Sequence, residues 1–169
     1  SAASDVYKRQ NINGGYSSES PHWISILNDM NRTQFHRGPD GNGTYLCDCC
    51  GLAHVRLAII DLVNGSQPLV KSHGGLKYAI SYNGEIYNMK ELRSALKAEG
   101  ATFDTASDTE VILEGYMRHG SDFIKCLNGI FAAAILDENH NRLILFRDRL
   151  GVKPLFYTPV SYTHLTLPT

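Results

Sequence analysis

The alternation of apolar and polar residues predicts several strands. "KYAISY" (77–82) alternates with a period of two, which is typical of a half-buried strand. "GIFAAAIL" (129–136) and "RLILF" (142–146) flank "DENHN", and this arrangement predicts a hairpin with a five-residue loop. The stretch 44–62, "TYLCDCCGLAHVRLAIIDL", predicts an earlier hairpin with a long second strand.

Helical spacing of apolar residues begins at Ser20-Pro21, a cap followed by a first-turn proline. The buried stripe predicted for this helix is Trp23, Ile26, Leu27 and Met30. Between this helix and the first hairpin, "HRGPDGNG" (36–43) holds three glycines and a proline. We expect it to form a shaped loop that is neither helix nor central strand.

Two further helices follow the "KYAISY" strand. Asn88 and Glu91 have the spacing of a capping box, and Gly100 ends that helix. Ser107 and Glu110 repeat the capping pattern, with a stop at residue 120 and a short apolar segment over 123–127. Strands in antiparallel pairs and helices in a block predict an α+β fold, with helices packed against antiparallel sheet. No glycine-rich phosphate loop of standard spacing is present.

The two ends of the chain lack this patterning. Residues 1–10, "SAASDVYKRQ", have no clear pattern, and the end of the chain is rich in threonine. We interpret residues 1–10 as a non-native linker, residues 11–157 as a partial domain, and residues 158–169 as a non-native tail.

Composition excludes several classes of function. The formal net charge is −1, which gives no electrostatic basis for binding nucleic acid. No apolar run reaches the length of a membrane span, and no charged start leads into an apolar stretch. We expect a cytoplasmic protein with no membrane contact.

Three of the four cysteines crowd into "CDCC" (47–50). Cys47 and Cys50 supply half of a zinc motif, and no second half follows. A strand would direct Cys47 and Cys49 to one face and Cys50 to the other. We expect reduced thiols in a hairpin and no metal, and we keep a small thiol or metal module as an alternative.

Polar groups in apolar surroundings point to an amino-acid pocket. Arg56 lies among strand hydrophobics and needs an anion, such as an α-carboxylate. Glu85 and Asp108 precede helices and could hold an α-ammonium. Asn83 and Gly84 could donate to an oxyanion, although Asn-Gly is more often a turn, Asp108 resembles a helix cap, and Arg56 could have a structural partner.

Seven motifs in order carry a resemblance to a known family. They are "HRGPDGNG", "LAHVRLAIIDL", "GSQPL", "YNGEIYN", "SDTEVIL", "LNGIFAAAILD" and "RDRLGVKPLFY". Over residues 21–157 they resemble the glutaminase domain of glutamine-hydrolysing asparagine synthetase, a class II glutamine amidotransferase. Pro39-Asp40 and the run 147–151 favour this branch over the related purine and hexosamine enzymes. The resemblance implies an N-terminal-nucleophile fold, with antiparallel sheets sandwiched by helices (αββα), incomplete here.

The resemblance also implies roles for individual residues. Arg56 would bind the α-carboxylate of glutamine, with backbone of Leu57 and Ile59 lining the site. The α-ammonium would lie against Glu85 and Asp108. Asn83 and Gly84 would form the oxyanion hole. The family's nucleophile is an N-terminal cysteine whose own amine acts as the base.

This chain departs from the family at its start, because no cysteine precedes Cys47. We therefore expect it to be inactive as a glutaminase and only marginally stable. A non-catalytic glutamine-binding module is the alternative. In the full-length enzyme, ammonia would pass to a synthetase domain that uses ATP and Mg²⁺ to amidate aspartate. This chain itself would need no cofactor, and the full-length protein could form a homodimer.

Overall fold

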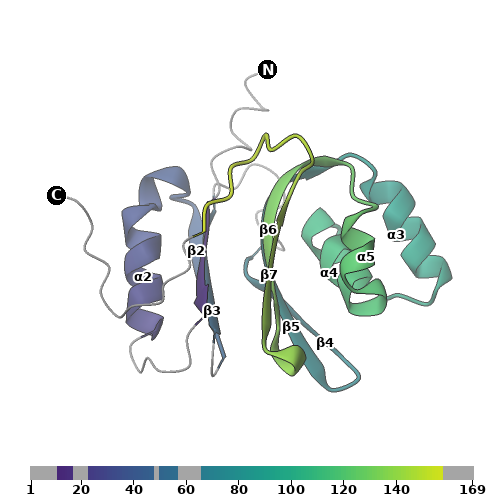
Figure 1. The fold of residues 1–169 in the computed structure, drawn as a ribbon, viewed down its shortest axis with the longest axis horizontal. Coiled ribbons are helices and arrows are strands. Elements are labelled where there is room, and N and C mark those ends of the chain that lie inside the picture. The colour runs from purple at the N-terminus through teal and green to yellow at the C-terminus, as the bar shows by residue number, and fades with distance from the viewer. Residues whose placement is uncertain (1–10, 17–22, 48–49, 57–65, 158–169) are drawn as a thin grey trace.

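The computed structural model describes residues 11–16, 23–47, 50–56 and 66–157. These residues form four layers in the order helix, sheet, sheet, helices (Figure 1). The layered α+β architecture expected from the sequence is confirmed. None of the described helices is long and apolar enough to cross a membrane.

The first sheet has three antiparallel strands in the order β1-β3-β2. They are β1 (Asn11–Tyr16), β2 (Gly41–Leu46) and β3 (Cys50–Arg56). Helix α2 (Trp23–Thr33) covers the outer face of this sheet, and the short helix η2 (Phe35–Arg37) follows it (Figure 1). The predicted hairpin of residues 44–62 is present as β2 and β3, and its expected continuation over 57–62 lies outside the described residues.

The second sheet has four antiparallel strands in the order β4-β5-β6-β7. They are β4 (Leu69–His73), β5 (Leu76–Ile86), β6 (Gly129–Asp137) and β7 (Arg142–Arg147), with η3 (Glu138–His140) in the last hairpin. Its outer face carries α3 (Met89–Ala98), α4 (Asp108–His119) and α5 (Ser121–Ile124), as Figure 1 shows.

Two apolar clusters hold the layers together. The larger lies between the second sheet and its helices and includes Ile80, Tyr82, Ile112 and Ile135. The smaller lies between the two sheets and is formed by Cys50, Leu52, Ala79, Ala134 and Leu136. Even-numbered positions of β5 therefore face the helices, while odd-numbered positions face the first sheet.

The stripe predicted for the first helix is only partly buried. Leu27 is fully buried and Met30 is half-buried, but Ile26 is 38% exposed. Successive residues of a helix are separated by about 100° around its axis, and α2 packs on one sheet as an outer layer. The contact is therefore narrower than the four-residue stripe. Ser20, Pro21 and the Trp23 side chain lie outside the description.

The glycine-rich segment 36–43 is only partly a loop. It begins in η2, and residues 41–43 are the first residues of β2. The segment was expected to be neither helix nor central strand. Its strand residues belong to β2, which lies at the edge of the sheet and fits this expectation, whereas residues 36–37 form the end of η2 and contradict the expected absence of helix. An edge strand tolerates glycine, and here a Cβ on Gly43 would lie 2.1 Å from the carbonyl oxygen of Gln67.

The capping predictions were right at one helix and wrong at the other. The Ser107 hydroxyl accepts a hydrogen bond from Glu110 N–H at 3.3 Å, as expected of an N-cap. The Asn88 side chain does not cap α3. Its amide instead donates to Cys126 O at 2.9 Å and accepts from Asn128 N–H at 3.0 Å. This tertiary bridge competes successfully with the local cap.

Candidate functional site

Strands β3 and β5 face each other across the space between the sheets. His54 Nδ1 and Ser81 Oγ form a buried hydrogen bond of 2.9 Å. Because side chains alternate along strands, Arg56 and Asn83 lie two residues further along on the same inter-sheet faces. The fold thus brings the predicted carboxylate ligand and the predicted oxyanion donor to adjoining strand ends.

Asn83, Gly84 and Glu85 are strand residues rather than a turn. They pair with Ala132, Phe131 and Ile130 of β6, and β5 continues to Ile86. The interpretation of Asn-Gly as a turn was wrong because a long ladder with β6 overrides the local preference of this dipeptide.

Gly84 is required by packing. A Cβ at this position would lie 2.2 Å from Ile130 O and 2.5 Å from Phe131 Cα. Any side chain would push β5 away from β6, the strand with which this end of β5 pairs. The glycine therefore has a structural reason to be present, whatever its backbone N–H does for a substrate.

Asp108 is the first residue of α4 and lies close to the end of β5. Its Oδ2 accepts a hydrogen bond from the Tyr82 hydroxyl at 2.8 Å, and its Oδ1 accepts from Thr109 N–H at 2.9 Å. Burial raises the pKa of the Asp108 carboxyl, although these hydrogen bonds act in the opposite direction. The carboxylate is fixed by neutral donors.

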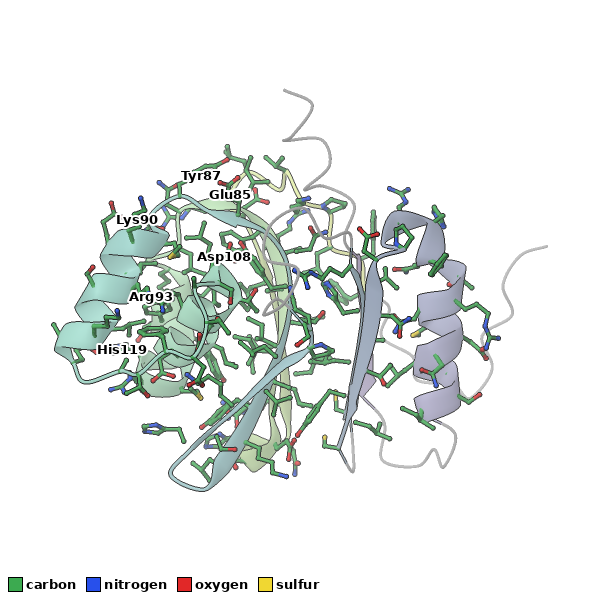
Figure 2. The ribbon with its side chains drawn as sticks, turned by 180° about the vertical axis from the view of Figure 1, so that it is seen from behind. Glu85, Tyr87, Lys90, Arg93, Asp108 and His119 are labelled. Carbon is green, nitrogen blue, oxygen red and sulfur yellow. The ribbon has the colours of Figure 1, made fainter. Side chains whose placement is uncertain are left out.

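Glu85 and Asp108 both lie close to Tyr82, and their joint role in holding an ammonium stays a prediction. Burial raises the pKa of Tyr82 far above its ordinary value, and the negative charges of Asp108 and Glu85 raise it further. Figure 2 shows both acids at the same end of the second sheet, near Tyr87. Among the described residues neither acid has an ion-pair partner. Two carboxylates at one strand end are a suitable place for a cation.

Arg56 is the last residue of β3 and is half-buried. Its carbonyl accepts a hydrogen bond from Asp40 N–H at 3.0 Å, which ties the Pro39-Asp40 loop to the strand. Burial lowers the pKa of His54 to about 3, and the positive charge of Arg56 contributes. His54 is therefore a neutral core residue. Leu57 and Ile59 lie outside the described residues.

Two residues at this site were not singled out from the sequence. Tyr82 reaches Asp108 through its hydroxyl. The side-chain amide of Gln67 binds both backbone groups of Tyr82: it accepts from the N–H at 2.6 Å and donates to the carbonyl at 3.0 Å. Both lie inside motifs that were noted, "YNGEIYN" and "GSQPL", but only the tertiary structure joins them.

The described cysteines of "CDCC" lie in the predicted hairpin, Cys47 after the end of β2 and Cys50 at the start of β3. The Cys47 N–H donates a hydrogen bond to Cys50 O at 2.9 Å. Cys50 belongs to the inter-sheet cluster and Cys47 packs against it. Cys49 lies outside the described residues. In the described parts of the chain, no three potential metal ligands lie together.

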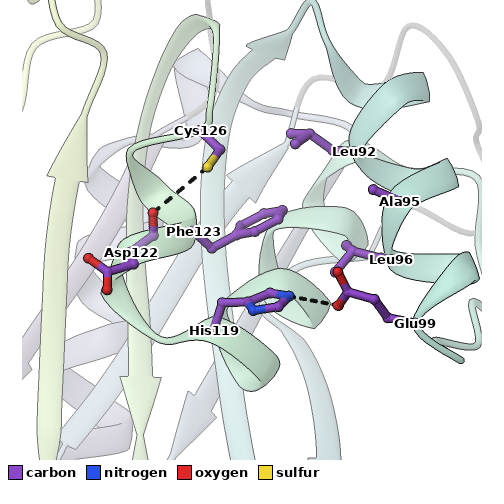
Figure 3. A pocket seen from close by; sticks show the side chains of 8 residues that line it. All are labelled: Leu92, Ala95, Leu96, Glu99, His119, Asp122, Phe123 and Cys126. Carbon is purple, nitrogen blue, oxygen red and sulfur yellow. Dashed lines mark hydrogen bonds and ion pairs between the residues drawn. The ribbon is translucent and has the colours of Figure 1, made fainter.

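A hollow of about 320 Å³ lies on the helical side of the molecule, away from these residues (Figure 3). It is lined by Leu92, Ala95, Leu96, Glu99, His119, Asp122, Phe123 and Cys126. None of the predicted site residues lines it. We base the site on the strand ends, because the charged and polar groups predicted from the sequence converge there.

Solved structures with a related fold include an amidotransferase. Glutamine phosphoribosylpyrophosphate amidotransferase from B. subtilis, solved with ADP and GMP, aligns with a TM-score of 0.61 at 22% identity. The alignment covers 75% of this chain and 35% of that one. The allosteric regulatory enzyme of purine biosynthesis aligns with a TM-score of 0.50 at 28% identity over 59% of this chain and 23% of that one. The fold is thus the N-terminal-nucleophile sandwich that the sequence resemblance implied.

Sequence relatives point to the same family. Asparagine synthetase [glutamine-hydrolyzing] 3 of Bacillus subtilis (strain 168) is 45% identical over 132 residues, 78% of this chain and 22% of that protein. Asparagine synthetase [glutamine-hydrolyzing] 2 of Arabidopsis thaliana is 44% identical over the same coverage. The chain spans about a fifth of the length of these relatives. A family model described as a glutamine amidotransferase domain matches residues 11–167, and the chain belongs to that family.

Proposed function

We propose that this chain is the glutaminase part of a glutamine-hydrolysing asparagine synthetase. The full-length protein would release ammonia from glutamine and use it, with ATP and Mg²⁺ bound in a separate synthetase domain, to amidate aspartate. The names of the relatives and the seven ordered motifs support this assignment. The free thiol of Cys126 suits a cytoplasmic enzyme, and we include a homodimer of the full-length protein in the proposal.

Glutamine would be recognised by its charged head. Arg56 would bind the α-carboxylate in a charge-assisted pair, with backbone of Leu57 and Ile59 beside it. Glu85 and Asp108 would receive the α-ammonium. The side chain of glutamine would then extend along the inter-sheet face toward Asn83 and Gly84. Their amide groups would stabilise the oxyanion formed when a nucleophile attacks the carboxamide.

The observation that carries this proposal is the meeting of two acids at the end of β5. Both act on the Tyr82 phenol, and among the described residues neither is neutralised by a basic side chain. Asp108 is half-buried and Glu85 is exposed, and carboxylates so placed are stabilised by a cation. The α-ammonium of glutamine would be that cation.

We further propose that the chain as printed binds glutamine without hydrolysing it. Its first cysteine is Cys47, which packs with Cys50 on the cluster containing Ala79 and Leu136. Ala79 precedes Asn83 by four strand residues, a distance of about 13 Å. A thiol held there would not reach a carboxamide at Asn83, so the oxyanion hole would have no developing charge to stabilise.

Calorimetric titration with glutamine, together with an ammonia-release assay, tests both parts. We expect binding by the 169-residue chain and ammonia release at least about 10³-fold below that of the B. subtilis relative. Arg56→Met should weaken glutamine binding about tenfold, since it removes the partner of the carboxylate. Lys125→Met, which removes an exposed cation on the helical side, should leave binding unchanged. Turnover close to that of the relative would refute the binding-only proposal.

A non-catalytic glutamine-binding module is the second candidate, since Arg56, Glu85 and Asp108 would hold glutamine by its charged groups without any nucleophile. The coding sequence upstream of "NINGGY" separates the two. A start that reads Met-Cys-Gly supports the enzyme. A native start without cysteine supports the binding module.

A further inference from the structure

Tyr82 lies in β5 next to the candidate site, and its side chain is on the helical face of the second sheet, where it is 2% exposed. The hydroxyl donates to Asp108 Oδ2 at 2.8 Å. A side chain buried to this extent with a polar tip needs a partner, and that partner is the carboxylate placed in the substrate site.

The donor is held rigidly before any ligand arrives. Gln67 clamps the Tyr82 backbone through its side-chain amide, at 2.6 Å to the N–H and 3.0 Å to the carbonyl. Tyr82 also pairs with Ala133 of β6. The phenol therefore approaches Asp108 from a fixed direction, which is what a positioning group requires.

The acceptor is held at its second oxygen as well. Asp108 Oδ1 accepts from Thr109 N–H at 2.9 Å, and Ser107 caps the helix that starts here. The donors to the carboxylate, which include the Ile86 backbone as well, are neutral, so its negative charge is oriented without being cancelled. Glu85 follows Tyr82 by three residues on the same strand end, and the negative charges of Glu85 and Asp108 both act on the Tyr82 phenol.

We propose that Tyr82 is a positioning residue whose hydroxyl orients the Asp108 carboxylate so that, together with Glu85, it receives the ammonium group of a free amino acid. This inference rests on the proposed function, because it takes an amino acid as the ligand. Without the hydroxyl, Asp108 Oδ2 loses its buried donor and the carboxylate turns away from the geometry that a bound ammonium needs.

Binding of two ligands to three proteins tests the proposal. The proteins are the 169-residue chain, Tyr82→Phe and Tyr116→Phe; the last is a matched control, because the Tyr116 hydroxyl also donates to a buried carboxylate, Asp137, at 3.3 Å. The ligands are glutamine and glutaramic acid, which lacks the α-ammonium. We expect Tyr82→Phe to weaken glutamine binding about tenfold and to leave glutaramic acid unchanged, and Tyr116→Phe to change neither. Equal losses for both ligands, or for both variants, overturn the proposal.

An NMR titration of the Asp108 carboxylate separates failure of this inference from failure of the proposed function. The Tyr82 hydrogen bond stabilises the charged carboxylate, so the pKa of Asp108 should rise in Tyr82→Phe and stay unchanged in Tyr116→Phe. An Asp108 pKa that does not move in Tyr82→Phe overturns the inference whether or not glutamine binds. If the pKa moves but the unmodified chain binds no glutamine, the proposed function fails, and the ammonium part of the inference fails with it.

Discussion

At the scale of single residues, the candidate site includes positions where packing and the proposed chemistry both require the same residue type. Gly84 is the clearest case, because β6 leaves no room for a side chain there. Gly41, at the start of the edge strand β2, has open space around it instead. An alanine side chain would therefore clash with β6 at Gly84 but would have no neighbour within 4 Å at Gly41.

Replacing Gly84 with alanine should destabilise the protein by about 1–3 kcal/mol, because the new Cβ would overlap backbone of Ile130 and Phe131. Urea unfolding monitored by circular dichroism measures this change. Gly41→Ala is the control and should lie within about 0.5 kcal/mol of the unmodified chain. Equal stability of the two variants would show that β5 and β6 separate without cost at this point.

At the scale of elements, a buried ion cluster fixes α4 against the second sheet. Lys71 of β4 pairs with Glu110 at 2.8 Å and with Glu114 at 3.0 Å. Glu110 also accepts hydrogen bonds from the N–H groups of Asp104 and Thr105. The cluster therefore holds the segment that leads into Asp108. The Glu110 side chain was expected to complete a capping box, but it serves this tertiary contact.

Lys71→Met should cost about 3–5 kcal/mol of stability, because it leaves the buried Glu110 carboxylate without its cation. Glu114 keeps its ion pair with Arg118 at 3.1 Å. Lys125→Met is the matched control. It breaks an exposed pair with Asp122 and should cost less than about 1 kcal/mol. Thermal unfolding of both variants makes the comparison, and a similar small loss in each would mean that the buried cluster contributes nothing beyond a surface pair.

The cluster also has a defined pH window. Burial pushes the pKa of Glu110 up, but hydrogen bonds from Lys71, Thr105 and the backbone outweigh it, so the net shift is downward. The contribution of Glu110 to stability is complete above its ordinary pKa of 4.5. This contribution is lost as the pH falls through the lower pKa that Glu110 has in the folded state. Burial lowers the pKa of Lys71, but its two carboxylate partners prevail and raise it above 10.5. That contribution is lost only as the pH rises beyond this value.

At the scale of the whole molecule, the described parts of the two sheets meet at a small apolar cluster and at a buried polar pair. His54 of the first sheet and Ser81 of the second form that pair, close to the candidate site. The imidazole is 1% exposed and neutral. Protonating the imidazole would place a positive charge between the sheets beside Arg56, so acid should weaken the contact between the two sheets.

As the pH is lowered from 6.5 to about 3, the free energy of unfolding should therefore fall by roughly 1.4 kcal/mol per pH unit through His54 alone. In this window the unfolded chain binds a proton that the folded chain excludes. Urea unfolding at several pH values, compared between the unmodified chain and His54→Gln, isolates this slope. His73→Gln, which replaces an exposed histidine at the end of β4, should keep it. An unchanged slope in His54→Gln contradicts the prediction.

The sequence by itself determined the layered α+β architecture, both hairpins and the Ser107 cap, because hydrophobic periodicity and capping act over a few residues. It also supplied the family, through ordered motifs. The tertiary structure decided that Asn83-Gly84-Glu85 is strand and that Asn88 bridges rather than caps. It also joined Tyr82 to Asp108 and Gln67. Those outcomes depend on β6, α4 and residues far away in the chain, and no local pattern encodes which distant backbone a strand or carboxylate will meet.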